Sequence, residues 1–333
     1  MQKEVAVMID TLYGTVFHRL RTNKNITLQT IENATGISNS FVSRFERGRS
    51  DITLTKLMPL LKAIHVPYPE FFFEYTYGRL ADPADSPAAI RAKLAAFLTP
   101  LDDNLTTGFT LRSEHYEEAI ALAAKQKARF QAEPSQTNLL MLAFFRGLAH
   151  YLQTEYTTAH PAAAGAIPPD TGTPILRHYL LTVDDWGSYE ITLFVMAAVL
   201  FTPAENLQLL RQGYRKSQRL GISRTFTTLQ FQLLFSDFTV LLARRAWPEA
   251  QAVLTMMTER PSDDLTERNL TLFARGWLQI RQGQRTAGEK TCRQALAIFR
   301  ILGADESAAL WETYLTGILA EPPSQFILLN LDF

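Results

Sequence analysis

The pattern of a short amphipathic helix is found in Ser38-Asn39-Ser40-Phe41-Val42-Ser43-Arg44-Phe45-Glu46-Arg47-Gly48. Val42 and Phe45 are three residues apart and share one face of such a helix, and Gly48 suits the residue that ends it. The positions on the opposite face are small, polar or cationic, namely Asn39, Ser40, Ser43 and Arg44. Side chains of this kind reach base edges in a DNA major groove, where Asn pairs with adenine and Arg with guanine. The stretch therefore predicts a DNA-reading helix.

Four further helices are expected around this one. The first spans residues 5–22, and the second runs from Leu28 to Ala34 behind the capping residue Thr27. Gly36 provides the left-handed turn, and Ser38 caps the DNA-reading helix. Asp51 or Thr53 caps a fourth helix, and prolines 67 and 69 open a fifth. Five short helices with a glycine turn between the second and third predict a helix-turn-helix domain over residues 1–75. The alternative is a helical bundle with no DNA role.

The charge of this region supports the DNA-binding interpretation. The formal net charge of the chain is zero, but from Arg19 to Arg49 six cations face two anions, a local excess of +4. Localised positive charge is what a phosphate backbone attracts. Lys24, Arg47 and Arg49 are expected to contact phosphates rather than bases. Because the excess is modest, one copy is expected to bind weakly and a homodimer to be needed.

The strongest motif is the run from Val42 to Gly48 followed by Asp51-Ile52-Thr53-Leu54. Residues 16–73 resemble phage-repressor-type helix-turn-helix domains, and this motif resembles the start of Rgg (Rgg/GadR/MutR) family regulators. The resemblance implies a transcription regulator of Gram-positive bacteria, with a TPR-like domain that binds a short peptide pheromone in quorum sensing. It also implies a structural pair between Arg21 and Glu46. Leu28 stands where such domains often carry Gln, so one usual contact is not expected.

The remainder of the chain is expected to be helical, which makes the fold class all-α. Residues 76–87 are small or proline-rich and predict a linker, and residues 88–320 predict a TPR-like α-solenoid for regulation and dimerisation. One helix pair fits this template well, because apolar and small residues stand where helices approach closely: Leu272, Gly276, Gly288, Cys292 and Ala295. Stacked helix pairs create a concave face, where a peptide is expected to bind.

Polar residues inside apolar helices are the candidates for peptide contact. They are Arg146, Arg177, Tyr179, Asn269 and Arg275. A buried Arg requires an anionic or carbonyl partner, and a peptide carboxylate would supply one. For each residue the alternative is an internal salt bridge or an exposed position. Residues 321–333 form a detached apolar tail, either an ordinary packing segment at a dimer interface or a segment that occupies a groove of its own or of a partner copy.

The sequence contains no motif that supports catalysis. Phosphate-binding loops, nucleophile elbows and metal-ligand spacings are missing, and the six histidines are scattered. No cofactor or metal is therefore expected. The single cysteine, Cys292, excludes an intrachain disulfide and is expected to be a buried small residue, with a redox sensor or an intermolecular link as the alternatives. No apolar run is long enough to cross a bilayer, and we expect a cytoplasmic protein. A TPR-type adaptor for a protein partner, or a regulator that senses another small ligand, remains the alternative function.

Overall fold

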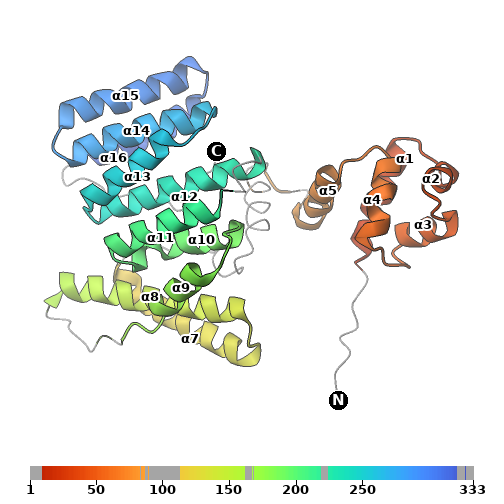
Figure 1. Ribbon diagram of the computed structural model, residues 1–333, viewed down its shortest axis with the longest axis horizontal. Helices are drawn as coiled ribbons and strands as arrows, with labels where there is room; N and C mark the ends of the chain where they lie inside the picture. The colour runs from red at the N-terminus through yellow and green to blue at the C-terminus, as the bar shows by residue number, and fades with distance from the viewer. Residues whose placement is uncertain are drawn as a thin grey trace. The chain divides into compact units, whose positions relative to one another are not determined.

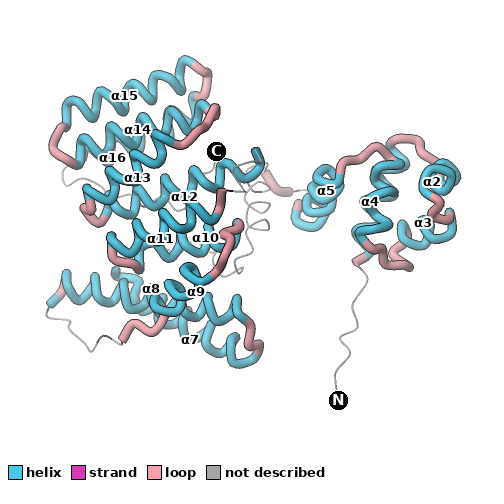
Figure 2. The backbone as a smooth tube through the Cα atoms, viewed as in Figure 1, coloured by secondary structure: helices cyan, strands magenta, loops and turns pink. Residues whose placement is uncertain are grey.

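The structure is a computed structural model that describes residues 10–82, 84–86, 89, 113–161, 167, 169–218, 224–320 and 327, without the side chains of 224–227. The chain divides into two compact units, Met1–Pro100 and Leu101–Phe333. Every regular element of the described residues is a helix (Figure 2), so the predicted all-α fold class is confirmed. Each unit has its own hydrophobic core.

Within the described residues of the first unit, the five helices predicted for the helix-turn-helix domain are present (Figure 1). These are α1 (Thr11–Asn23), α2 (Leu28–Thr35), α3 (Asn39–Glu46), α4 (Leu54–Ala63) and α5 (Tyr68–Leu80). The first helix was expected to begin at residue 5. It begins at Thr11 because Asp10 is its N-cap, where the Asp10 carboxylate accepts from the backbone N–H of Leu12 at 3.0 Å. The fifth helix continues to Leu80, five residues into the expected linker.

The second unit is a stack of helices that follow one another in chain order (Figure 1). Its first members are η2 (Ser113–His115), α7 (Tyr116–Ala132), α8 (Gln136–Ala159), α9 (Thr173–Thr182), α10 (Ser188–Ala197), η4 (Ala198–Leu200) and α11 (Pro203–Lys216). The stack continues with α12 (Arg224–Ala243), α13 (Trp247–Glu259), α14 (Leu265–Arg281), α15 (Arg285–Ile301) and α16 (Asp305–Leu319).

The expected TPR-like close approach occurs between α14 and α15. A Cβ placed on Gly276 would lie 2.6 Å from the Cys292 sulfur, and one placed on Gly288 would lie 2.5 Å from the carbonyl oxygen of Gly276. Only glycine lets the two backbones come this close. Cys292 is fully buried, and burial raises the pKa of its thiol to about 12. The prediction that Cys292 is a buried small residue is confirmed.

Of the apolar tail, the structure describes Ile327. This residue packs with Tyr151 and Leu200 against Ala198, Val199 and Val240. The rest of residues 321–333 lies outside the described part of the chain, so the hypothesis of a tail that occupies a groove stays a prediction. Among the described helices, none combines the length and the apolar character that a bilayer-crossing segment requires.

Candidate nucleic-acid interface

The inner face of α3 fixes this helix in the first unit. Val42 is fully buried and Phe45 is 3% exposed, and the Phe45 ring lies 5.7 Å from that of Phe17 on α1. The two helices are in backbone contact, since a Cβ on Gly14 would lie 2.0 Å from the Phe45 carbonyl oxygen. Burial of these side chains leaves the opposite face of α3 toward solvent.

The turn between α2 and α3 sets the angle at which α3 is presented. Gly36 has a φ of 71°, in the left-handed region where glycine carries no steric penalty. The Thr27 side chain caps α2 by accepting from the backbone N–H of Thr30 at 3.1 Å. Ser38 is the N-cap residue of α3, but its hydroxyl accepts no backbone N–H and instead lies 3.3 Å from the Ser40 hydroxyl. The capping hydrogen bond expected from Ser38 is therefore absent.

A buried ion pair ties the C-terminal end of α3 to α1. Arg21 Nε lies 2.6 Å from Glu46 Oε1 and Nη2 lies 2.9 Å from Oε2, which makes the contact bidentate. The remaining Arg21 nitrogen donates to the carbonyl oxygen of Ile26 at 2.7 Å, in the loop before α2. His18 Nδ1 lies 2.8 Å from Glu46 Oε2. One guanidinium thus connects α1, α3 and the loop that leads to α2, which suits the structural role expected for this pair.

The outer face of α3 carries the four residues that the sequence singled out for base contact. Ser40 and Arg44 are exposed, and Asn39 and Ser43 are half-buried. Asn39 Nδ2 donates to Gln29 Oε1 on α2 at 3.1 Å, and Asn39 Oδ1 is buried without a hydrogen-bond partner. In this arrangement Asn39 Oδ1 is buried, so the side chain does not present its acceptor to an adenine as it stands.

Gln29 is the residue that the sequence analysis missed. It is exposed, it accepts from Asn39, and its own Nε2 donates to Asn33 Oδ1 at 3.0 Å. Leu28 stands where Gln was considered from the sequence, whereas the neighbouring Gln29 reaches the start of α3. A polar residue in the first turn of α2 is the signal that would have identified it.

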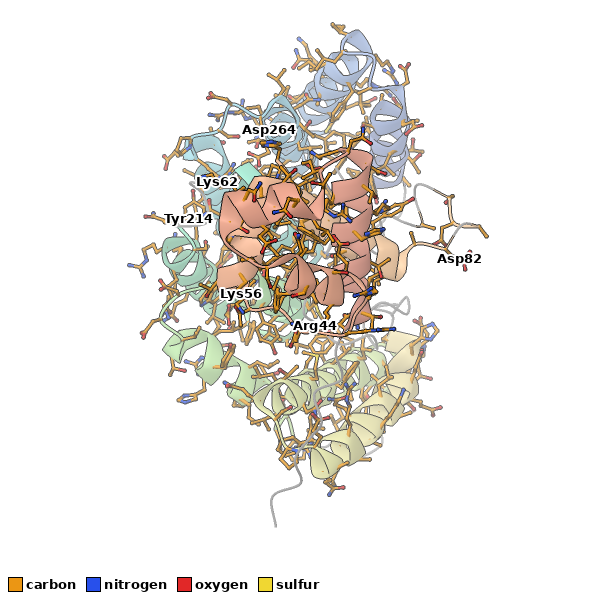
Figure 3. The ribbon with its side chains drawn as sticks, turned by 90° about the vertical axis from the view of Figure 1, so that its right-hand side faces the viewer. Arg44, Lys56, Lys62, Asp82, Tyr214 and Asp264 are labelled. Atoms are coloured by element: carbon orange, nitrogen blue, oxygen red, sulfur yellow. The ribbon has the colours of Figure 1, made fainter. Side chains whose placement is uncertain are left out.

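Unpaired cations cluster at the C-terminal end of α3. Within the described residues, the guanidinium groups of Arg44, Arg47 and Arg49 are exposed and have no hydrogen-bond or ion-pair partner in the protein. The Arg44 side chain projects from the edge of the unit (Figure 3). Such groups are available to a phosphate or a guanine base.

Two lysines of the first unit have different surroundings. Lys24, expected to contact phosphate, donates to the carbonyl oxygen of His65 at 3.0 Å in the loop between α4 and α5. Lys56 was not singled out from the sequence. Its ammonium lies 4.4 Å from the centre of the Phe41 ring, which places a cation from α4 beside α3.

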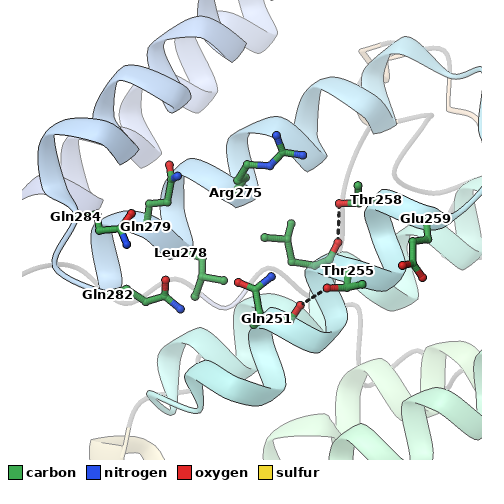
Figure 4. Close-up of a pocket in the computed structure, with 10 residues that line it drawn as sticks. Gln251, Thr255, Thr258, Glu259, Arg275, Leu278, Gln279, Gln282 and Gln284 are labelled. Carbon is green, nitrogen blue, oxygen red and sulfur yellow. Dashed lines mark hydrogen bonds between the residues drawn. The ribbon is translucent and has the colours of Figure 1, made fainter.

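The five residues expected to contact a peptide lie on three helices, α8, α9 and α14. Asn269 Nδ2 donates to the Ala295 carbonyl oxygen at 2.9 Å, and the Tyr179 hydroxyl donates to Glu190 at 2.6 Å. Arg177 lies 3.6 Å from Glu205. These three therefore have the internal partners that the alternative interpretation described. Arg275 lines a surface groove between α13 and α14 (Figure 4), and Arg146 is half-buried without a partner among the described residues.

The second unit matches a known family model. Residues 126–313 match the model described as HTH-type transcriptional regulator Rgg, C-terminal domain. Residues 17–71 match a helix-turn-helix model, which covers most of the five-helix unit. No curated protein matches the chain.

Solved structures share this fold. The SHP pheromone receptor Rgg2 of Streptococcus dysgalactiae is 20% identical, with a TM-score of 0.51 over 91% of this chain and 98% of that one. A putative transcriptional regulator from Listeria monocytogenes EGD-e is 18% identical, with a TM-score of 0.61 over 93% and 98%. PrgX in the PrgX/cCF10 complex is 14% identical, with a TM-score of 0.55 over 95% and 94%.

The family model and the fold agree with the motif between Val42 and Leu54. The matched Rgg segment alone spans more than half of the 333 residues, and the helix-turn-helix precedes it along the chain. The chain therefore belongs to the Rgg family of HTH-type transcriptional regulators.

Proposed function

We propose that this regulator reads a specific DNA operator with the outer face of α3. The observation that carries the proposal is the set of exposed, unpartnered guanidinium groups at Arg44, Arg47 and Arg49 beside the polar face of α3. Arg44 lies on the helix itself and suits a guanine, which Arg binds bidentately. Arg47 and Arg49 follow the helix and suit the phosphate backbone.

Gln29 and Asn39 would act together in this reading. Asn39 holds the Gln29 side chain through their 3.1 Å hydrogen bond, and Gln29 is the exposed member of the pair. Gln29 Oε1 keeps a second lone pair and Nε2 a second proton beside their bonds to Asn39 and Asn33, so this exposed amide is able to pair bidentately with adenine. In this account Gln29 takes over the adenine contact expected of Asn39, while Ser40 and Ser43 contact neighbouring positions. Lys56 adds a phosphate contact from α4, and the Lys24 ammonium keeps two further protons for phosphate while it binds His65.

The regulator would act as a homodimer under the control of a short peptide. The local charge excess of the DNA-reading region is small, so two copies on half-sites about 34 Å apart are expected to bind where one does not. Two structures of the same fold are those of a pheromone receptor and of a bacterial peptide pheromone/receptor complex, which supports a peptide ligand for the repeat unit. Arg146, half-buried and without an internal partner, is the strongest remaining candidate for the peptide carboxylate.

A selection experiment tests the DNA-binding proposal. The full protein is mixed with a random pool of duplex DNA, and the bound fraction is amplified over several rounds and sequenced. The proposal expects enrichment of a two-fold symmetric site, and binding of that site should weaken steeply as salt rises. Recovery of unenriched DNA at every round would contradict it and favour the adaptor function.

A further inference from the structure

Phe41 is an aromatic residue on the flank of α3, between the inner face of the helix and its polar outer face. The inner face is formed by Val42 and Phe45, which are 0% and 3% exposed. Phe41 is half-buried and packs only against the margin of the core that those two residues help to form. Part of its ring therefore stays at the surface of the DNA-binding unit, where a partner is able to reach it.

The position of Phe41 along α3 places the ring beside the proposed base-contacting residues. Residues three apart on a helix are neighbours on its surface, so Phe41 stands next to Arg44. Ser40, which directly precedes Phe41, is exposed like Arg44. A helix that lies in the major groove with Ser40 and Arg44 toward the bases therefore brings the Phe41 ring to the edge of the same surface.

Lys56 holds this ring from the neighbouring helix. Its ammonium, on the exposed part of α4, lies 4.4 Å from the centre of the Phe41 ring. A cation over an aromatic face is attracted to it, so this contact fixes the ring between α3 and α4. Lys56 and Arg44 both lie near the lower edge of the unit in Figure 3. The ring is thus placed between two cations that suit a nucleic acid.

The chemistry of the ring selects one kind of base. In the major groove thymine presents a 5-methyl group, and phenylalanine is one of the side chains that contact it. The donors and acceptors on the edges of the other bases would lose water against a ring that offers them no hydrogen bond. The other side chains proposed to contact bases all end in polar groups: Gln29, Ser40, Ser43 and Arg44.

We propose that Phe41 makes α3 select a thymine in each half-site by burying the 5-methyl group of that base against its ring. Lys56 is the positioning residue, because it holds the ring while its ammonium faces the adjoining phosphate. This inference rests on the proposed reading of DNA by α3 and adds one base to it.

The alternative role of Phe41 is purely structural. In that case the contact with Lys56 only packs α4 against α3, and the ring touches no base. Removing a methyl group from the DNA would then leave the affinity unchanged, although removing the ring from the protein would still lower stability. A change made in the DNA therefore separates the two roles.

The experiment replaces thymine with deoxyuridine in the selected operator, one position at a time and in both half-sites. Deoxyuridine lacks only the methyl group and still pairs with adenine. Fluorescence anisotropy with the full protein should find one position at which the replacement weakens binding about fourfold per half-site, which corresponds to about 0.8 kcal/mol for one methyl group. Indifference at every thymine, or a half-site without thymine, would overturn this inference and leave DNA reading by α3 intact. Failure to select any operator would overturn both proposals.

Substitution of the protein assigns the methyl contact to Phe41. Phe41→Ala should bind the operator and its deoxyuridine form equally. The matched control is Phe73→Ala, which removes a 52% exposed ring from α5 and should keep the fourfold ratio of the parent protein. Each ratio compares two duplexes on one protein, so a change in protein stability alone does not alter it.

Circular dichroism verifies that each variant is folded. If Phe41→Ala is unfolded, Phe41→Leu takes its place, because leucine keeps an apolar side chain at the flank of α3 but offers a smaller surface to the methyl group. The ratio should then fall below that of the parent protein. A fourfold ratio that persists in the folded variant would contradict the assignment of the thymine contact to Phe41.

Discussion

Arg21 and Glu46 form a charged contact that holds α3 against α1. Their side chains are 10% and 6% exposed, so each charge has lost most of its water and depends on the other. Nearby, Arg19 and Glu74 form a pair that is much more exposed. The two pairs have similar chemistry but different surroundings, and their contributions to stability should differ accordingly.

Replacing Arg21 with Ala should lower the free energy of unfolding by about 3–5 kcal/mol, because Glu46 then stays buried without its cation. Arg19→Ala is the control and should cost at most about 1 kcal/mol. Urea unfolding followed by circular dichroism measures both values. Similar small losses in the two variants would refute the structural role of the Arg21–Glu46 pair.

Asp237 is a buried carboxyl group in the middle of α12. Asn206 Nδ2 donates to its Oδ1, while Asp237 Oδ2 and Asn206 Oδ1 are both buried acceptors without a donor. Burial raises the pKa of Asp237 to about 7, and the Asn206 hydrogen bond opposes this shift. A proton on Asp237 would give the unpaired acceptors a donor, so the neutral form suits this site.

The stability of the protein should therefore fall as the pH rises from about 4 to about 7. The pKa is raised from a reference of 3.8, so the folded state holds this proton up to about pH 7 while the unfolded chain loses it above about pH 4, and the stabilising contribution is complete below about pH 4 and lost by about pH 7. The whole difference is at most about 4 kcal/mol. Asp237→Asn should shrink the gap in unfolding free energy between pH 5 and pH 8, and the exposed control Asp184→Asn should not. An unchanged gap in Asp237→Asn would contradict the assignment.

At the scale of elements, glycines have opposite roles in two helices. Gly276 lies where α14 meets α15, and an added Cβ would collide with backbone and sulfur atoms. Gly78 lies inside α5, where an added Cβ meets only the Leu12 side chain at 3.9 Å. Replacing glycine with alanine should thus lower the stability of the protein at Gly276 and raise it at Gly78.

Gly276→Ala should destabilise the second unit by about 1–3 kcal/mol through overpacking, despite the better helix propensity of Ala. Gly78→Ala should instead stabilise the first unit by about 0.4–1 kcal/mol. Thermal melts show whether each variant is more or less stable than the parent protein. A more stable Gly276→Ala protein would show that α14 and α15 are not in backbone contact.

The positions of the helices could be predicted from the sequence, whereas the hydrogen-bond partners of individual side chains could not. The period of apolar residues and the capping residue Thr27 placed the start of α2 at Leu28 and its end within one residue of the observed Thr35. Asn39 was expected to read adenine because periodicity placed it on the outer face. Its contact with Gln29 depends on the distance between α2 and α3, which only the folded turn at Gly36 determines.

At the scale of the whole molecule, the side-chain partners in the repeat unit could not be predicted from the sequence either. The motif and the helical tract identified the family, but the candidate residues of α8, α9 and α14 were chosen by residue type alone. Tyr179 and Asn269 proved to bond to neighbouring helices, and no linear pattern distinguishes such residues from Arg146 or Arg275. Partners that come from other helices require the packed structure.

Arg49 provides a test of how the molecule is held on DNA. If Arg49 binds phosphate, Arg49→Ala should weaken the selected duplex and a scrambled duplex by the same factor. The slope of log affinity against log salt should fall by about 1 for each bound copy. Fluorescence anisotropy at several salt concentrations measures both quantities. A loss confined to the selected duplex would instead assign Arg49 to base reading.

The most direct test of the account compares Arg44→Ala with the parent protein on two duplexes, the selected operator and its scrambled sequence. Arg44 projects from α3 without an internal partner, so its removal should leave the fold intact. We predict a loss of about 1–3 kcal/mol of binding free energy on the operator and a much smaller loss on the scrambled duplex. Equal losses on the two duplexes would contradict the claim that α3 reads the DNA sequence.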